Sequence, residues 1–146
     1  MDYFTAFAIS ASGMAVEKTR LDVTALNLAN ANSTKAGGRL FEPLTVVSAP
    51  KGTARFEQVF AGYSAQLPSR GVEVVAIQPS GVPPRLVHEP AHPDADARGF
   101  VAYPAINPLK EMMTIITATR AYEANLSALS AARTMAQRAL EIGGNS

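Results

Sequence analysis

The chain has 146 residues, of which 47% are hydrophobic and 17% are charged. Charged residues usually make up about a quarter of a soluble domain, so part of this surface is expected to be covered in the working state. Thirteen basic and twelve acidic residues give a formal charge of +1, which disfavours binding to nucleic acid. The sequence contains no cysteine, which excludes disulfides, thiolate zinc sites and thiol nucleophiles.

The apolar stretch near the start of the chain is too short to cross a membrane. Its longest uncharged run, from Tyr3 to Val16, has 14 residues, whereas a transmembrane helix needs about 20. A secretory signal peptide needs a basic residue before its apolar stretch, yet the first basic residue is Lys18. We therefore expect neither membrane insertion nor a cleaved signal peptide.

The distribution of proline divides the chain into three parts. All ten prolines lie between Pro43 and Pro108, and both ends are rich in alanine. Because alanine favours helices and proline breaks them, each end is predicted to form one long helix. The predicted fold class is α+β, with terminal helices that pair as a coiled coil and a small β-rich insert between them. The predicted boundaries are 1–36 for the N-terminal helical segment, 37–105 for the insert and 106–146 for the C-terminal helix.

Two apolar rows repeat every seven residues in the first segment. One row is Phe7, Met14, Leu21 and Leu28, and the other is Ile9, Val16 and Val23, with Leu26 three residues further on. An offset of two residues is roughly 200° around a helix, so the rows lie on nearly opposite faces. This predicts a packing partner within the chain on one face and other subunits on the opposite face. The pair Gly37 and Gly38 is interpreted as the stop after this helix.

The last segment has a well-marked helix start and a heptad pattern. Asn107 suits the N-cap position and Pro108 suits the first turn, and no breaker follows until Gly143. One row is Ile115, Tyr122, Leu129 and Ala136, and the other is Met112, Thr119, Leu126, Arg133 and Leu140, where Arg133 does not fit. The two rows predict a coiled-coil seam, although an ordinary amphipathic core helix explains the periodicity equally well.

The insert contains short runs typical of β-strands. Strands are predicted at Leu44–Val47, Phe56–Phe60 and Gly71–Ile77, and Leu86 with Val87 could form a fourth. Prolines recur so often between Pro79 and Pro108 that we expect an extended surface segment there, without regular structure.

One cluster of possible metal ligands lies in this segment. It consists of His88, His92, Asp94 and Asp96. Neighbouring prolines prevent the helix that would align the histidines, and Arg98 occupies a ligand position of a calcium loop. The cluster is better interpreted as a turn in which aspartates accept hydrogen bonds from the backbone. Neither a nucleotide-binding loop nor a nucleophile elbow occurs, so we expect no metal, no cofactor and no enzyme.

Three asparagines, Asn27, Asn30 and Asn32, lie close together near the end of the first helix. Asparagine is a mediocre helix former, so three of them have a cost that some interaction should offset. One interpretation is that their amides bond between neighbouring helices and fix the register, and the alternative is fraying at a helix end.

The residues at both ends resemble a known family. The segment from Ile9 to Met14, followed by Arg20 with Leu21 and by Asn27–Ala31, resembles the N-terminal signature of the bacterial flagellar axial proteins, the rod and hook subunits. Arg120–Asn125 is similar to the matching C-terminal signature. The stretches from His92 to Asp96 and from Gly99 to Pro104, with Asn107, Pro108, Glu111 and Met112, are most similar to the short subunits of the proximal rod. Residues 51–70 match no recognised pattern.

The resemblance implies a structural role. Such subunits stack into a tube, the basal-body rod, which crosses the periplasm and transmits torque towards hook and filament. The implied partners are copies of the chain, other rod subunits, the adaptor next to the inner-membrane ring and the flagellar type III export apparatus. Another axial subunit and, more remotely, a small metal-binding domain are the alternatives. Assembly and helix packing are assigned to Phe7, Ile9, Met14, Val16, Leu21, Val23, Leu26, Asn27, Leu28, Asn30, Met112, Ile115, Tyr122, Asn125, Leu126, Leu129 and Leu140.

Overall fold

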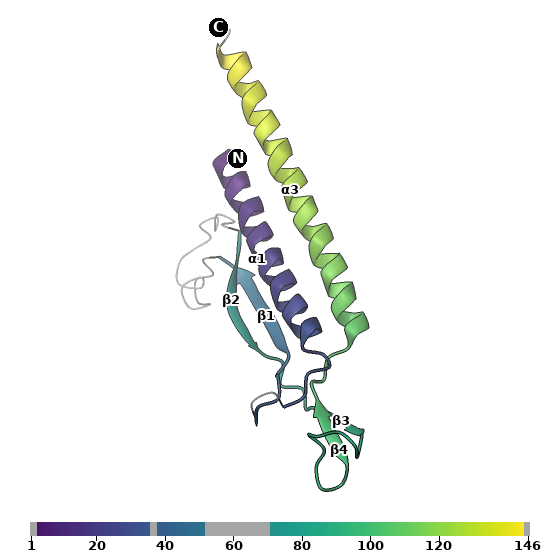
Figure 1. Ribbon diagram of the computed structural model, residues 1–146. Coiled ribbons are helices and arrows are strands. Elements are labelled where there is room, and N and C mark those ends of the chain that lie inside the picture. Colours follow the sequence, from purple (N-terminus) through teal and green to yellow (C-terminus); the bar gives the residue numbers. More distant parts are fainter. Residues whose placement is uncertain (1–2, 36–37, 52–70, 145–146) are drawn as a thin grey trace, which may run out of the picture. The chain divides into compact units, whose positions relative to one another are not determined.

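The computed structural model describes residues 3–35, 38–51 and 71–144 (Figure 1). Its elements are, in chain order, α1 (Tyr3–Ala29), β1 (Leu44–Pro50), β2 (Val72–Pro79), β3 (Arg85–His88), β4 (Phe100–Tyr103) and α3 (Pro108–Gly144). The predicted α+β class is confirmed. The strand predicted at Phe56–Phe60 lies outside the described residues.

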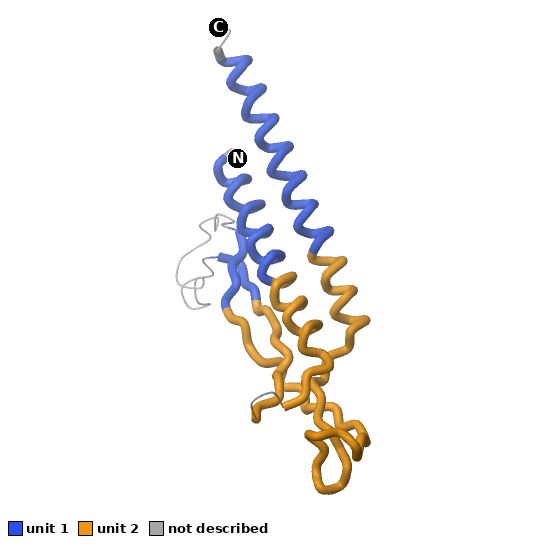
Figure 2. The backbone as a smooth tube through the Cα atoms, in the orientation of Figure 1, with its two compact units in different colours: residues 1–19, 48–75, 119–146 blue, residues 20–47, 76–118 orange. Residues whose placement is uncertain are grey.

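The chain forms two compact units, shown in different colours in Figure 2. Unit 1 contains residues 1–19, 48–75 and 119–146, and unit 2 contains residues 20–47 and 76–118. Both long helices contribute one part to each unit. Each unit therefore joins a piece of α1, a piece of the insert and a piece of α3.

Helix α1 has 27 residues and ends earlier than the glycine pair predicted. At its end, the Asn30 side chain donates to the Leu26 carbonyl at 2.9 Å, and the Ser33 hydroxyl donates to the Asn30 carbonyl at 2.8 Å. These side chains offer the backbone carbonyls an alternative to helical hydrogen bonds. The predicted stop at Gly37 and Gly38 is wrong because the helix already ends at Ala29.

Helix α3 begins where the sequence predicts. The side-chain oxygen of Asn107 accepts hydrogen bonds from the backbone N–H groups of Leu109 at 3.0 Å and Lys110 at 3.3 Å, which is an N-cap. Glu111 adds an acidic side chain to the first turn, where the helix dipole favours it. The helix has 37 residues and is thus about 55 Å long.

Strands β1 and β2 form a two-stranded antiparallel sheet. The Ser80 N–H donates to the Pro43 carbonyl at 2.7 Å at one end, and the Lys51 N–H donates to the Gly71 carbonyl at 2.8 Å at the other. The strands predicted at Leu44–Val47 and Gly71–Ile77 are confirmed; both extend further at the C-terminal end, and the second begins at Val72.

Strands β3 and β4 form a second antiparallel pair, in which Arg85 lies opposite Tyr103 and His88 lies opposite Phe100. The possible strand at Leu86 and Val87 is confirmed. The prediction that the chain from Pro79 to Pro108 lacks regular structure is wrong, because the prolines lie beside the two strands and not within them. Sequence reasoning missed β4 completely.

The buried core of the described residues is small and contains few large side chains. Val101 and Pro104 are the largest fully buried residues, and Val101 anchors β4. Ala118 and Ala132 are the buried residues of α3. Because small side chains fill little volume, backbones approach closely where they pack, and larger apolar side chains remain outside.

Candidate assembly surfaces

In unit 1, a polar side chain of α1 holds the start of β2. The Ser12 hydroxyl donates to the Ile9 carbonyl at 2.7 Å and accepts from the Val72 N–H at 3.0 Å. The preceding Gly71 has a φ of +87°, and a Cβ there would overlap the Ser12 oxygen. Glycine thus satisfies both a left-handed backbone conformation and a close approach to α1.

A second contact in unit 1 joins α1 to α3. A Cβ placed on Gly13 would lie 2.8 Å from the Asn125 side-chain oxygen, so the two helices approach closely at this point. The Asn125 amide donates to the Ala121 carbonyl at 2.9 Å, which fixes its orientation. Sequence reasoning included Asn125 but missed Gly13, for which a single glycine inside an alanine-rich helix was the available signal.

In unit 2, Asn27 joins three elements. It is 4% exposed, its amide nitrogen donates to the Leu44 carbonyl at 2.9 Å, and its oxygen accepts from the Leu44 N–H at 2.9 Å. The same nitrogen donates to the Glu111 carboxylate at 3.3 Å. The amide therefore bonds between elements as one interpretation expects, but its main partner is strand β1 and not a neighbouring helix. The helix-end alternative describes Asn30, which bonds to its own helix.

The two apolar rows of α1 differ in burial. Val16 and Val23 of the second row are buried, and Ile9 is half-buried. Leu26, which was assigned to the same row, is 46% exposed. The first row, consisting of Phe7, Met14, Leu21 and Leu28, is half-buried throughout. Since α1 contacts both a strand and α3 within each unit, this chain itself covers part of the face that was predicted for other subunits.

The seam of α3 differs from the predicted seam by one residue. The row of Ile115, Tyr122, Leu129 and Ala136 is half-buried. The other inward row contains Glu111, Ala118, Asn125 and Ala132. Met112, Leu126 and Leu140 of the predicted row are 50%, 46% and 75% exposed, so they form no seam within the chain, and their assignment to assembly stays a prediction. Small and polar residues occupy the inward row because the helices approach closely there. Arg133, which did not fit the predicted row, is exposed and so needs no place in a seam.

Met112, Leu126 and Leu140 of α3 are exposed and are called its exposed apolar row. Leu109, Met113, Ile116, Met135 and Ile142 of the same helix are exposed as well. Scattered apolar residues are normal on a surface, but a helix that exposes them over most of its length is typical of an interaction surface.

The histidine and aspartate cluster forms a turn between β3 and β4. The Asp96 carboxylate accepts from the backbone N–H groups of Phe100 at 2.9 Å and Arg98 at 2.8 Å. The hydrogen bond from Phe100 is the main cause that lowers the Asp96 pKa. His92 accepts from the Asp94 N–H through Nδ1 at 3.1 Å. These side chains thus act as turn residues, as the sequence favours.

Aromatic and charged groups stabilise the hairpin next to this turn. The Tyr103 hydroxyl donates to the Glu89 carboxylate at 2.9 Å, and this bond raises the Tyr103 pKa. The Arg85 guanidinium lies 5.4 Å from the centre of the Tyr103 ring. The His88 and Phe100 rings meet edge to face at 5.1 Å. Over residues 3–35, 38–51 and 71–144, no three His, Asp or Glu side chains are grouped to hold a metal ion.

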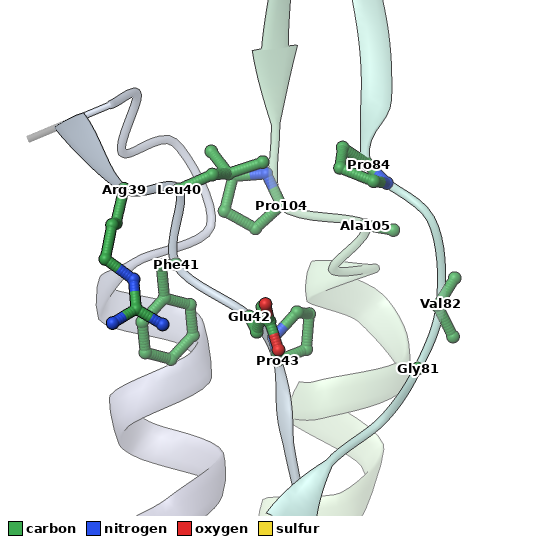
Figure 3. A pocket seen from close by; sticks show the side chains of 10 residues that line it. All are labelled: Arg39, Leu40, Phe41, Glu42, Pro43, Gly81, Val82, Pro84, Pro104 and Ala105. Atoms are coloured by element: carbon green, nitrogen blue, oxygen red, sulfur yellow. The ribbon is translucent and has the colours of Figure 1, made fainter.

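A groove of about 450 Å³ lies in unit 2 where three irregular segments meet (Figure 3). It is lined by residues 39–43, by Gly81, Val82 and Pro84, and by Pro104 and Ala105. Arg39 and Glu42 are the charged residues among these, and they include no histidine, serine or threonine. The lining thus offers no pair of nucleophile and base.

Two long helices with a small core and an exposed apolar row are typical of a subunit that works by association. In the part of the chain that the structure describes, no helix combines the length and apolarity required to cross a membrane. A family model described as the C-terminal region of the flagellar basal body rod FlgEFG proteins matches residues 97–142.

Three relatives match along nearly their whole length, and each is described as flagellar basal-body rod protein FlgC. The Aquifex aeolicus protein is 41% identical over 142 residues, which cover 97% of both chains. The Bacillus subtilis protein is 34% identical over 149 residues, which cover 98% of this chain and 99% of the relative. The Salmonella typhimurium protein is 34% identical over 140 residues, which cover 94% and 95%. The chain belongs to the FlgC family of flagellar basal-body rod proteins.

Proposed function

We propose that this chain is a structural, non-catalytic subunit of the flagellar basal-body rod. It stacks with copies of itself and with other rod subunits into a tube that crosses the periplasm and transmits torque towards hook and filament. The observation that carries this proposal is the exposed apolar row of α3, together with membership of the rod protein family. A side chain such as Leu140 gains about 1.5–3 kcal/mol when a neighbour covers it completely.

The two helices pair as an antiparallel coiled coil. Two contacts support this part of the proposal, one in each unit: Gly13 with Asn125, and Asn27 with Glu111. From the first contact to the second, both helices advance by two heptads in opposite directions. A repeat of seven residues on both partners is the spacing that a coiled coil requires.

The remaining partners follow from the family. The chain leaves the cytoplasm through the flagellar type III export apparatus without a cleaved signal peptide, and the adaptor next to the inner-membrane ring is its neighbour at one end of the rod. A formal charge of +1 is consistent with protein partners and disfavours nucleic acid as a partner.

Chemical cross-linking tests the proposed assembly surface. The natural sequence contains no cysteine, so Leu126→Cys and Leu140→Cys each place one unique thiol on the exposed row. A thiol-linked photo-cross-linker at either position should join the chain to a second rod subunit in isolated basal bodies. The matched control is Ala124→Cys, an exposed residue two positions before Leu126 and therefore about 200° away around the helix. Equal cross-linking from all three positions, or from none, would contradict the proposed surface.

A further inference from the structure

The side chain of Asn27 makes the hydrogen bonds that a neighbouring β-strand would make to Leu44, the first residue of β1. In an antiparallel ladder, two residues exchange both backbone hydrogen bonds as a pair. Here the single amide of Asn27 donates to the carbonyl of Leu44 and accepts from its N–H, both at 2.9 Å. One helical side chain therefore satisfies both backbone groups of one strand residue, which it holds in a single register.

The third hydrogen bond, from the Asn27 amide to Glu111, restricts position 27 to asparagine. Leu44 and Glu111 both offer acceptors to residue 27, and Leu44 also offers a donor. One planar group must thus supply two N–H donors and one oxygen acceptor. Among side chains of this size only asparagine does so, because aspartate lacks the donors and leucine lacks all three functions.

We propose that Asn27 is a positioning residue that fixes β1 against α1 and α3 in unit 2, and that rod assembly requires its pairing with Glu111. The assembly readout rests on the proposed function. A residue that merely fills space would tolerate Asn27→Asp, which changes the shape very little. A residue that works through its donors would not, because the carboxylate faces the Leu44 carbonyl and the Glu111 carboxylate.

The test is a double-mutant cycle in a strain that lacks this protein. Asn27→Asp should reduce the number of complete hook–basal bodies roughly tenfold, since a buried acceptor without a donor costs about that factor in an equilibrium. Glu111→Gln alone should assemble normally, because a glutamine oxygen still accepts from Asn27. The double variant Asn27→Asp with Glu111→Gln should recover part of the loss, because the glutamine amide then donates to Asp and the two negative charges no longer face each other, while the Leu44 carbonyl still lacks its donor.

Two outcomes would overturn the inference. One is normal assembly of Asn27→Asp at the natural subunit level, checked by immunoblot. The other is a double variant that is no better than Asn27→Asp alone, which also covers the case in which the single variant simply fails to fold. Failure of the proposed function looks different: the strain that lacks the protein would then build complete hook–basal bodies without complementation.

Discussion

Helices α1 and α3 carry the same sevenfold repeat but use it differently. Among the described residues, α1 exposes two large apolar side chains, Phe4 and Leu26, whereas α3 exposes eight. In α1, the buried polar side chain of Asn27 bonds to the backbone of a strand. In α3, the buried positions are the small residues Ala118 and Ala132.

This difference shows that periodicity alone does not reveal which partner covers a face. Strands of the same chain and α3 both contact α1 within each unit, so α1 completes much of its packing inside the subunit. The inward side of α3 combines the half-buried Ile115, Tyr122 and Leu129 with small and polar residues, whereas eight other large apolar side chains of this helix are exposed. We infer that α3 supplies the larger part of the assembly surface.

The largest effect is expected for a charge in the inward row of α3. Leu129 is half-buried in this row, and a carboxylate there would lack a partner and lose the apolar contacts of leucine. Leu129→Asp should therefore abolish swimming in a complementation assay, and electron microscopy should find no complete rods. A tube repeats the defect in every copy, which amplifies it.

The matched control for this prediction is Leu129→Met. It keeps the volume and the apolar character, so swimming should be retained. Full swimming of Leu129→Asp at the natural subunit level would show that this row of α3 is not packed in the rod.

A smaller effect is expected where α1 meets β2. Gly71→Ala should lower the free energy of unfolding by about 2–4 kcal/mol, because alanine is strained at positive φ and its Cβ would displace the Ser12 hydroxyl. Gly81→Ala is the matched control: its φ is +69°, but nothing lies within 4 Å of an added Cβ. It should cost only the strain, about 1–2 kcal/mol. Denaturant titration of the purified chain measures both, and equal losses would mean that the Ser12 contact contributes nothing.

At the contact between the two helices, the effect of Gly13→Ala on stability should change sign when Asn125 is also replaced. Gly13→Ala should destabilise the chain slightly, by about 1 kcal/mol or less, because its Cβ crowds the Asn125 amide. In an Asn125→Ala background, the same substitution should stabilise it by up to about 1 kcal/mol, because alanine is the better helix former. Thermal unfolding followed by circular dichroism measures both steps. Stabilisation in both backgrounds would contradict close packing at this position.

The smallest effect concerns the turn between β3 and β4. The Asp96 pKa lies below its ordinary value of 3.8, mainly because the Phe100 N–H donates to the carboxylate. Ionised Asp96 therefore contributes stability that is fully present above this ordinary value and is lost as the pH falls through the lowered pKa. The Phe100 amide resonance should titrate in this acidic range. Asp96→Asn should remove the titration and should lose, near neutral pH, the small stability that the ionised carboxylate contributes. An unchanged titration in the variant would assign it to another group.

The sequence predicted the helices better than their partners. Proline-free ends and the Asn107 cap locate α3 correctly, because caps and breakers act locally. The second row of α3 was missed because Met112 and Leu126 are more apolar than Ala118 and Ala132, and hydrophobicity does not distinguish an inward small residue from an outward large one. The end of α1 was missed for a related reason: the helix ends next to Asn30, whose side chain bonds to the Leu26 carbonyl, whereas the glycine pair was the more obvious signal.

The insert was harder to predict because its signals conflict. Strand β4 has only four residues and follows a stretch dense in proline, so the proline signal outweighed it. The sequence predicted that the Asn27 amide bonds to another element, but it did not predict that this element is a strand. A sequence shows that an asparagine is costly in a helix, but the acceptor that offsets the cost, here Leu44, becomes visible only in three dimensions.

The composition of unit 1 constrains the order of folding. It joins residues 1–19 with residues 119–146, so the packing of Gly13 depends on a residue near the opposite end of the chain. Contacts between residues so distant in sequence form slowly, because a long loop must close before they contribute free energy. During synthesis, the first helix emerges long before its partner exists and cannot complete its core. The subunit consequently reaches its native state only after the last helix is available, and folding is a late event for the whole chain.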